Sequence, residues 1–281
     1  MNRLSTERRA QVIAALTEGL SIRATCRLTG VARETVNSLL LDVGAAVSRY
    51  MDVAFRNLAP ARIEADEIWA FVGSKDRNVP EGCEDDPNYG SIWTWIALDA
   101  DTKLVPCWVV GDRSIEDCYS FLRDLRSRFV PGHRFQLTTD GLGLYPPVVD
   151  SLWRDGIDFG QVIKEYGNPP ADEARRYSPA PCQSMEKRVV CGDPDPRLMS
   201  TSYVERQNLT LRMSNRRYTR LTNAFSKRAE QHAASVALHF ANYNLCRPHQ
   251  SLGKRITPAM AAGIESHPWT AYDLAKLLES N

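Results

Sequence analysis

The sequence lacks the features that mark membrane, secreted and zinc-bound proteins. Its 281 residues contain no run of about 18 apolar residues, which excludes a membrane-spanning helix of ordinary length. The first residues, MNRLSTERRAQ, are polar and have no apolar stretch typical of a signal peptide. The seven cysteines are odd in number and form no CxxC pair, so they favour free thiols over disulfides or a zinc site. We therefore expect a cytoplasmic protein.

Internal repeats, low-complexity tracts and a large net charge are also missing. The formal net charge is only +1, but it is unevenly distributed. Residues 61–200 carry a net charge of −8, whereas residues 1–60 carry +3 and residues 201–260 carry +8. Two interpretations explain such a pattern. The charges are either solvated surface faces, or an acidic core that holds metal ions between two basic segments that bind DNA. The charges alone leave both interpretations open.

The first 50 residues predict a small all-α domain. Helices are expected over residues 6–16, 21–28 and 32–46, with the segment 50–60 connecting to the next domain. Gly19 ends the first helix, Ser21 caps the second, and Gly30 lies in the turn before the third. A helix, a glycine-containing turn and a second helix form a helix-turn-helix unit.

The last of these helices has an apolar face and a polar face. Val31, Val36 and Leu39 are expected to point inward. Polar side chains that a DNA-binding helix would direct into the major groove are expected to point outward: Arg33, Thr35, Asn37 and Ser38. A three-helix packing unit without a DNA role is the alternative.

From residue 61 the pattern changes to strands. We predict strands over residues 63–72, 91–98, 104–110, 135–139 and 159–166, with a loop over residues 73–90 and helices over 114–129 and 143–153. The last of these helices is expected to be interrupted near Pro146 and Pro147. Residues 167–200 are polar and Pro-rich and are expected to form an irregular insertion. Helices follow from about Ser202, over residues 223–245, and near Pro258.

This order of elements predicts an α/β fold with a mixed sheet and flanking helices. Three antiparallel strands followed by parallel crossovers are the order of the ribonuclease-H-like fold. The predicted domains are a helix-turn-helix domain over residues 1–50, a catalytic domain over residues 60–264, and a helical tail over residues 265–281.

Three carboxylates lie where chemistry on a phosphodiester would need them. Asp66 lies within the first strand, Asp140 follows another strand, and Glu205 lies in the first turn of a helix. A charge inside a strand is costly unless it is paired or coordinated. Glu64 and Glu67 complicate the choice of Asp66, because Glu64 shares its face of the strand and Glu67 faces the other way. Two divalent metal ions held by carboxylates can activate water and neutralise a phosphate. Taken singly, each residue is also explained as a turn, cap or helix-dipole residue.

Amide and guanidinium groups follow Glu205 along its helix. Asn208, Arg212 and Arg216 are spaced to lie close to one helical face, and Arg217 and Arg220 extend the basic patch. Arginine suits bidentate contacts with phosphate, so we expect a DNA-contacting surface beside the carboxylates. A solvated basic helix is the alternative.

Several stretches resemble the conserved blocks of insertion-sequence DDE transposases. They are residues 66–69 (DEIW), 139–141 (TDG), 203–208 (YVERQN), 216–227 (RRYTRLTNAFSK), 243–252 (YNLCRPHQSL) and 257–259 (TPA). The sequence is most similar to the insertion-sequence-one family. It has no cysteine-based zinc module of the kind that some members carry.

The resemblance implies a ribonuclease-H-like enzyme that uses Mg²⁺ or Mn²⁺. It implies the catalytic and metal-binding triad Asp66, Asp140 and Glu205, and a basic residue seven positions after the glutamate, here Arg212. Such enzymes bind terminal inverted repeats in double-stranded DNA, cleave a strand, and join the freed 3′-OH to target DNA. The partners implied are double-stranded DNA and further copies of the chain, because two ends must be paired, and the implied location is the bacterial nucleoid.

Two other functions stay open from the sequence. A transposase-derived regulator would bind DNA without cutting it. A related nuclease would hydrolyse DNA but not join it.

Overall fold

The computed structural model describes residues 4–167, 182–219 and 222–279. Its helices are α1 (Thr6–Thr17), α2 (Ile22–Thr29), α3 (Arg33–Ala54), α4 (Ile115–Ser127), α5 (Tyr145–Trp153), α6 (Ser202–Ser214), α7 (Ala229–Ala241), α8 (Pro258–Ala261) and α9 (Ala271–Lys276). Its strands are β1 (Arg62–Val72), β2 (Gly90–Asp99), β3 (Trp108–Gly111), β4 (Gln136–Asp140), β5 (Asp158–Tyr166) and β6 (Cys182–Cys191). Short 3-10 turns at Asp76–Asn78, Arg216–Tyr218 and Gln250–Leu252 join some of them. No helix in these ranges combines the length and apolarity needed to cross a membrane.

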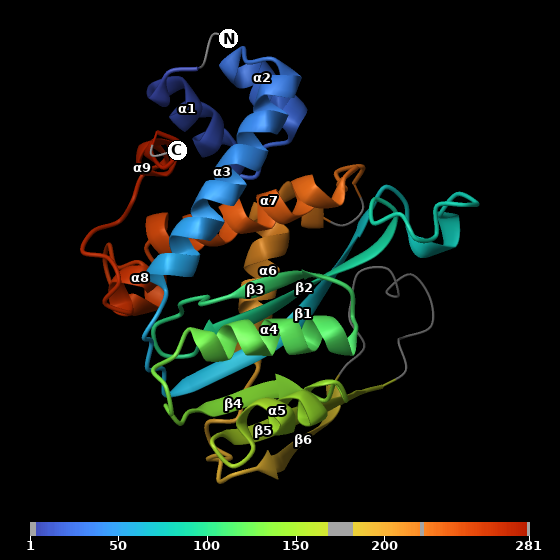
Figure 1. The fold of residues 1–281 in the computed structure, drawn as a ribbon, viewed down its shortest axis with the longest axis vertical. Helices are drawn as coiled ribbons and strands as arrows, with labels where there is room; N and C mark the ends of the chain where they lie inside the picture. Colours follow the sequence, from blue (N-terminus) through green and yellow to red (C-terminus); the bar gives the residue numbers. More distant parts are fainter. Residues whose placement is uncertain (1–3, 168–181, 220–221, 280–281) are drawn as a thin grey trace.

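The described strands form one mixed sheet with the order β3-β2-β1-β4-β5-β6 (Figure 1). Strands β3, β2 and β1 are antiparallel, whereas β1, β4 and β5 run parallel. This is the strand arrangement of the ribonuclease-H-like fold, so the predicted fold class is confirmed. In the register, Ala65 pairs with Thr139, which brings Asp66 beside Asp140.

Helices cover both faces of the sheet. On one face, Phe121 of α4 and Tyr145 of α5 pack against Ile63 and Ala65 of β1. On the other face, α6 and α7 pack against the alternate β1 residues, among them Ile68. Because side chains alternate along a strand, β1 packs on both sides, and its apolar residues on either face lie in the two hydrophobic clusters while its charged residues stand among them.

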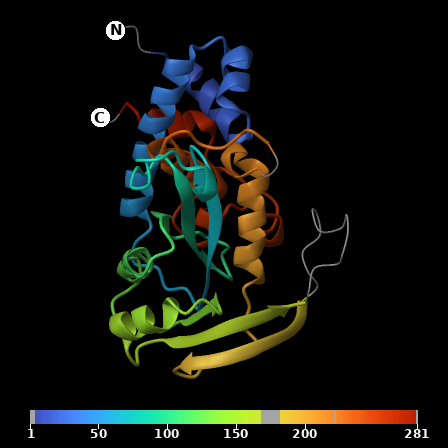
Figure 2. The ribbon, with the colours of Figure 1, turned by 90° about the vertical axis from the view of Figure 1, so that its right-hand side faces the viewer.

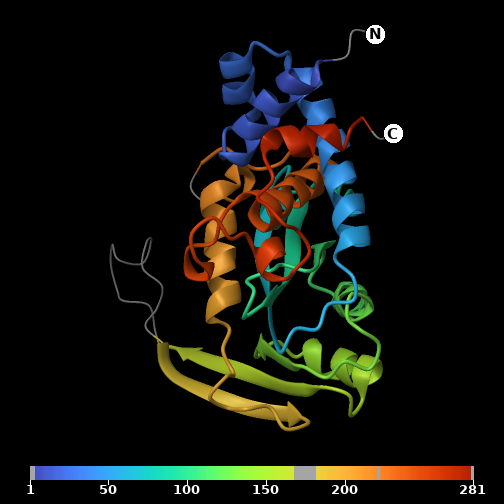
Figure 3. The same ribbon diagram turned by 90° about the vertical axis from the view of Figure 1, so that its left-hand side faces the viewer.

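The N-terminal helices pack on the C-terminal helices at one end of the molecule, and β4, β5 and β6 lie at the other end (Figures 2 and 3). Ser5 and Ser21 cap α1 and α2, and Gly30 ends α2 with a left-handed φ of 70°. Val36 of α3, Ala234 of α7 and buried apolar residues of α9 belong to one hydrophobic cluster. Val31, Val36 and Leu39 are buried as expected, and Arg33 and Thr35 are exposed.

Three expectations about the helices are wrong. Helix α3 continues to Ala54 instead of ending near residue 46, because Val47, Met51 and Phe55 continue its buried face. The two prolines do not interrupt α5, since it begins at Tyr145 and holds them in its first turn, where a missing N–H costs nothing. The helix expected over residues 223–245 begins at Ala229 and ends in a π-helical turn, Asn242–Cys246.

Two expectations about strands also need correction. The strand expected over residues 104–110 is β3, Trp108–Gly111, although the carbonyls of Leu104 and Cys107 still accept hydrogen bonds from β2. The segment 167–200 is not irregular throughout, because residues 182–191 form β6 on β5. Most β6 side chains are exposed, so the strand carries no apolar alternation that could have revealed it. Residues 168–181 lie outside the described part.

The contact between α3 and α7 is too close for a side chain at Gly44. A Cβ there would lie 2.7 Å from both Cα and Cβ of Ala234. We expect Gly44→Val to force the helices apart and to lower the free energy of unfolding by about 1–3 kcal/mol. Thermal or urea unfolding measures the change. Gly143→Val is the control because a Cβ at Gly143 meets nothing within 4 Å, and equal stability of the two variants would contradict the close packing.

Candidate active site

A pocket of about 730 Å³ opens where β4 ends. Strand β4 stops at Asp140, whereas β1 and β5 continue beyond it on either side. The pocket is lined by β1 and β5, by the turn after Asp140, and by α6. Ligand sites in α/β proteins commonly lie at the carboxyl ends of strands. Asp66, Asp140 and Glu205, the three carboxylates singled out in the sequence, all line this one pocket.

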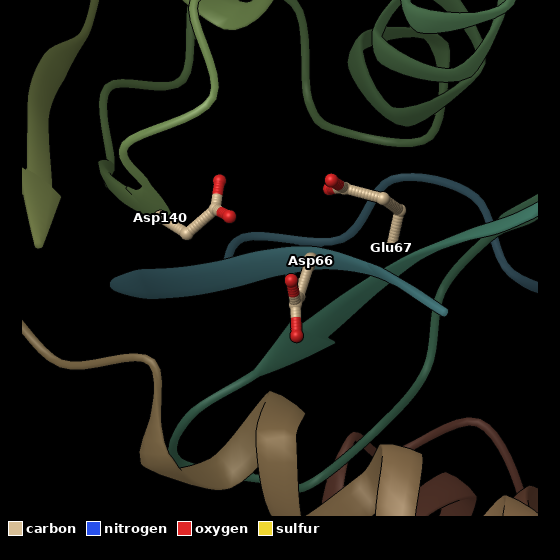
Figure 4. A group of neighbouring side chains, drawn as sticks. All are labelled: Asp66, Glu67 and Asp140. Carbon is tan, nitrogen blue, oxygen red and sulfur yellow. The ribbon is translucent and has the colours of Figure 1, made fainter. Parts of the chain in front are cut away.

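A compact group of carboxylates lies at the mouth of β4. Oxygen atoms of Asp66, Glu67 and Asp140 lie within 4.8 Å of one another (Figure 4). Asp66 and Glu67 project from opposite faces of β1, and Asp140 stands beside them at the end of β4. Because β4 provides no neighbour to β1 past Ala65, both side chains reach the open space at this edge.

The carboxylates of this group repel one another in a poorly solvated place. Burial, and then the charges of Glu67 and Asp140, raise the pKa of Asp66 to about 8. Burial and the charge of Asp140 also raise the pKa of Glu67. Both effects disfavour the ionised forms. A bound cation would relieve this repulsion, so the group is electrostatically suited to hold one.

Glu67 is the member of this group that sequence reasoning assigned to the opposite face of the strand. That assignment is right for the backbone, because Glu67 lies on the α4 and α5 side, where it is 8% exposed. Arg113 donates two hydrogen bonds to Glu67 Oε1, at 2.9 and 2.5 Å, and Tyr145 donates one to Oε2 at 3.3 Å. Strand alternation predicts which face a residue occupies, but not that a long side chain curls around a free strand edge.

Asp140 is held at the start of the turn that follows β4. Its Oδ1 accepts a hydrogen bond from the backbone N–H of Leu142 at 3.0 Å. Its carbonyl oxygen accepts another from the side-chain amide of Gln161 at 2.8 Å. A Cβ at Gly141 would lie 3.2 Å from Ile163, so the turn passes close to β5. These contacts fix the direction in which the carboxylate leaves the strand.

Glu205 lines the same pocket but does not join the group of three. Its carboxylate forms an ion pair with Lys164 of β5 and accepts a hydrogen bond from Thr201 Oγ1 at 2.5 Å. The Glu205 side chain is 45% exposed, so it lies at the solvent side of the pocket. A cation that bound Glu205 would therefore meet the carboxylate where the ammonium group of Lys164 now lies.

Asn208 and Arg212 come from α6 into the pocket rather than lying on an outer basic stripe. The Asn208 amide donates a hydrogen bond to Asp66 Oδ2 at 2.7 Å. Its Oδ1 is buried and accepts no hydrogen bond from the residues that the structure describes. An orphaned amide oxygen beside clustered carboxylates is a hard-oxygen donor set of the kind that Mg²⁺ and Mn²⁺ prefer. These residues therefore fit a divalent metal ion.

The remaining predicted DNA-binding residues lie elsewhere. Helix α6 ends at Ser214, so Arg216 and Arg217 are on the next turn and do not continue the stripe of Asn208 and Arg212. Arg216 is exposed, whereas Arg217 donates a hydrogen bond to buried Ser226, and burial lowers the pKa of Arg217 to about 10.

The predicted DNA-binding residues of α3 lie apart from the pocket. Arg33 pairs with Glu34 at 3.0 Å, and Asn37 lies near it on α3. Arg220 falls outside the described residues.

Glu64 fixes the start of α6 on the sheet. Its Oε2 accepts hydrogen bonds from the backbone N–H groups of Tyr203 and Val204, at 2.8 and 3.0 Å. These donors are unsatisfied at a helix N-terminus, which also carries partial positive charge. Glu64 is 3% exposed and lies two residues before Asp66. One strand therefore carries Asp66 and also holds the helix turn that presents Glu205.

We expect Glu64→Ala to lower the free energy of unfolding by about 1–3 kcal/mol, because two buried N–H groups lose their acceptor. Glu64→Gln retains an acceptor oxygen and is expected to lose less. Urea unfolding of both variants measures the difference. Equal losses in the two variants would mean that the contact with α6 depends on the charge and not on the hydrogen bonds.

Comparison with known proteins gives one sequence relative. The chain is 27% identical over 169 residues to the insertion element iso-IS1n protein InsB of Shigella dysenteriae, covering 60% of this chain and 86% of that protein. No protein-family model matches the sequence.

Solved structures give weaker likenesses. A piggyBac transposase in a synaptic complex with hairpin DNA aligns with a TM-score of 0.46 and 13% identity, over 100% of this chain and 73% of that chain. A pre-cleavage Mos1 transpososome aligns with a TM-score of 0.23 and 13% identity, over 57% and 60% of the two chains. Because these scores are low, the fold assignment depends on the strand order described above. The relative from Shigella confirms the resemblance to insertion-sequence transposases that the sequence blocks indicate.

Proposed function

We propose that the protein is a DNA transposase that cleaves strands at the ends of a mobile element and joins them to target DNA. The observation that carries the proposal is the group of clustered, partly buried carboxylates at the end of β4, facing α6 across one pocket. Sequence similarity to an insertion-element protein supports the same function. In metal-dependent polynucleotidyl transfer, divalent cations neutralise the phosphate while it is attacked, and a group of carboxylates is suited to hold such cations.

We assign the catalytic and metal-binding triad to Asp66, Asp140 and Glu205. Divalent Mg²⁺ or Mn²⁺ bound by these side chains would supply an activated nucleophile and neutralise charge on the scissile phosphate. Asp66 and Asp140 already lie together at the end of β4. Asn208 orients Asp66 through its amide N–H and leaves its oxygen for a ligand in the pocket.

Glu205 is preferred over Glu67 as the third carboxylate because of the partners that each side chain has. Arg113 holds Glu67 through two hydrogen bonds to one oxygen, and its guanidinium also lies 4.8 Å from the Trp93 ring. A planar guanidinium fixed in this way is hard to displace. Glu205 pairs instead with the ammonium of Lys164, on a flexible stem, at the solvent side of the pocket. Glu205 is therefore the carboxylate that can turn toward an entering cation.

The DNA would be held by both basic parts of the chain. We infer that Arg33, Thr35 and Asn37 of α3 read the terminal inverted repeat. Arg212, in the pocket, and Arg216 and Arg217, beyond the end of α6, contact phosphates. Arg220 belongs to the same basic stretch in the sequence. Pairing two element ends requires at least two copies of the chain, so a homo-oligomer is part of the proposal.

The direct test is a cleavage and joining assay on a labelled duplex that carries the inverted repeat flanking the gene. With Mg²⁺ or Mn²⁺ we expect nicking at the repeat end and transfer of that end to a second duplex. Asp140→Ala and Glu205→Gln are expected to lower the rate by at least about 10²-fold, because each removes an oxygen ligand.

Glu186→Gln on exposed β6 is the matched control for loss of one carboxylate away from the pocket. Binding without cleavage in either metal, equal in wild type and Asp140→Ala, would instead support a DNA-binding regulator. Hydrolysis without transfer of a pre-cut end would support a nuclease.

Metal binding can be tested without DNA. Folding raises the pKa of the Asp66 carboxyl from 3.8 to about 8, which lowers stability at pH 7 because the unfolded carboxyl would be ionised. Asp66→Asn has no such cost, so we expect its metal-free form to melt a few degrees above wild type at pH 7 in EDTA. We expect Mn²⁺ to raise the melting temperature of wild type, because a ligand that binds only the folded state stabilises it. The increase should be much smaller for Asp66→Asn. A Mn²⁺ effect of the same size in both proteins would place the metal elsewhere.

A further inference from the structure

A second large hollow lies between the helix-turn-helix unit and the segment that follows α6. It encloses about 1320 Å³. One wall is formed by α2 and the first turns of α3, and includes Arg23, Arg33 and Asn37. The other wall is formed by residues 214–217 and 223–231, which connect α6 to α7 and begin α7. We call this hollow the basic groove.

The charges in the basic groove come from both walls. Arg23 and Arg33 contribute from the helix-turn-helix side, and Arg216, Arg217, Lys227 and Arg228 contribute from the other side. Glu34 and Glu230 are the acidic residues in its lining, and they pair with Arg33 and Arg228. The cations outnumber the carboxylates, so the groove attracts a polyanion.

The two walls are held together by packing that leaves no room for side chains. A Cβ at Gly19, in the turn between α1 and α2, would lie 2.8 Å from the carbonyl oxygen of Ser214 at the end of α6. Gly44 of α3 is equally close to Ala234 of α7. The helix-turn-helix unit is therefore docked on α6 and α7, and the separation of the two walls is set by backbone contact.

We propose that the basic groove binds one segment of duplex DNA with both walls at once. The polar face of α3 would enter the major groove while Lys227, Arg216 and Arg228 grip the adjacent phosphates. Arg33 and Asn37 line the hollow, so DNA that enters it to reach them also meets the opposite wall. This inference depends on the proposed function for the identity of the ligand, and it adds that recognition and phosphate gripping occur on the same duplex within one protomer.

Helix α6 sets the distance from the basic groove to the acidic pocket. Glu205 lines the pocket and Ser214 lines the groove, nine residues apart on one helix. At 1.5 Å per residue this is about 14 Å, or roughly four base pairs of duplex. We place the duplex along α6, so phosphates held in the groove are expected to lie about four base pairs from the phosphate that is cut.

The test is duplex binding measured as a function of salt, with Arg33→Ala for one wall, Lys227→Ala for the other, and the double variant. All three proteins should keep the wild-type melting temperature, because both side chains are exposed. Each single substitution is expected to weaken binding several-fold, and Lys227→Ala, which removes a phosphate contact, is expected also to reduce the slope of log K against log salt by about one. Arg126→Ala is the control, because Arg126 is an exposed residue of α4 that lines neither the groove nor the pocket. It should change neither the affinity for the duplex nor the salt slope.

Footprinting on the same duplex supplies the second readout. We expect Lys227→Ala to remove backbone protection next to the bases protected by α3, roughly four base pairs from the nick. If Lys227→Ala behaves like Arg126→Ala while Arg33→Ala weakens binding, α3 binds DNA outside the groove and the inference is overturned. If Lys227→Ala weakens binding and Arg33→Ala does not, or if neither does, it is overturned as well.

The same duplex separates this inference from the proposed function. Cleavage that persists while the two wall variants bind normally would overturn the groove and leave the transposase function standing. Binding that depends on both walls, without cleavage in Mg²⁺ or Mn²⁺, would support the groove and overturn the enzyme.

Discussion

The mutual repulsion of buried carboxylates is the constraint around which this structure is organised. Asp66, Glu67 and Asp140 meet where a strand ends, and burial raises the pKa of Asp66 to about 8. A folded protein keeps such an arrangement only if neighbouring elements hold it in place. The neighbours do so with positive charge and hydrogen bonds, since Arg113 engages Glu67 and Asn208 engages Asp66.

The strand that carries Asp66 also explains how a helix distant in sequence reaches the site. Glu64 accepts the first free N–H groups of α6, and Asn208 of the same helix binds Asp66. These two contacts, made by Glu64 and Asp66, fix how far α6 reaches over the strand and how it is turned about its axis. Glu64, which the sequence offers as an alternative to Asp66, is therefore part of the support for Glu205.

Much of this could be predicted from the sequence, and the failures have physical causes. Strand β1, the strand that ends at Asp140 and helix α6 all follow from residue patterns along the chain, which are local signals. The position of the Glu67 carboxylate depends on where β4 ends beside β1, which is a property of the tertiary pairing. Likewise, β6 has mostly exposed side chains, so only its pairing with β5 defines it.

Asn208 and Arg216 show how helical spacing misplaces residues when a helix ends between them. The sequence places them eight residues apart, close to one face if the helix continued. Because α6 ends at Ser214, Asn208 and Arg212 face the acidic pocket while Arg216 lines the basic groove. The end of this helix thus divides one basic stretch into two surfaces of different chemistry. One surface contacts a carboxylate through the amide of Asn208, at the site proposed to hold a metal ion. The other lies against the helix-turn-helix unit, where phosphate contacts are proposed, and under that proposal the rigid helix between the two surfaces sets their spacing along the DNA.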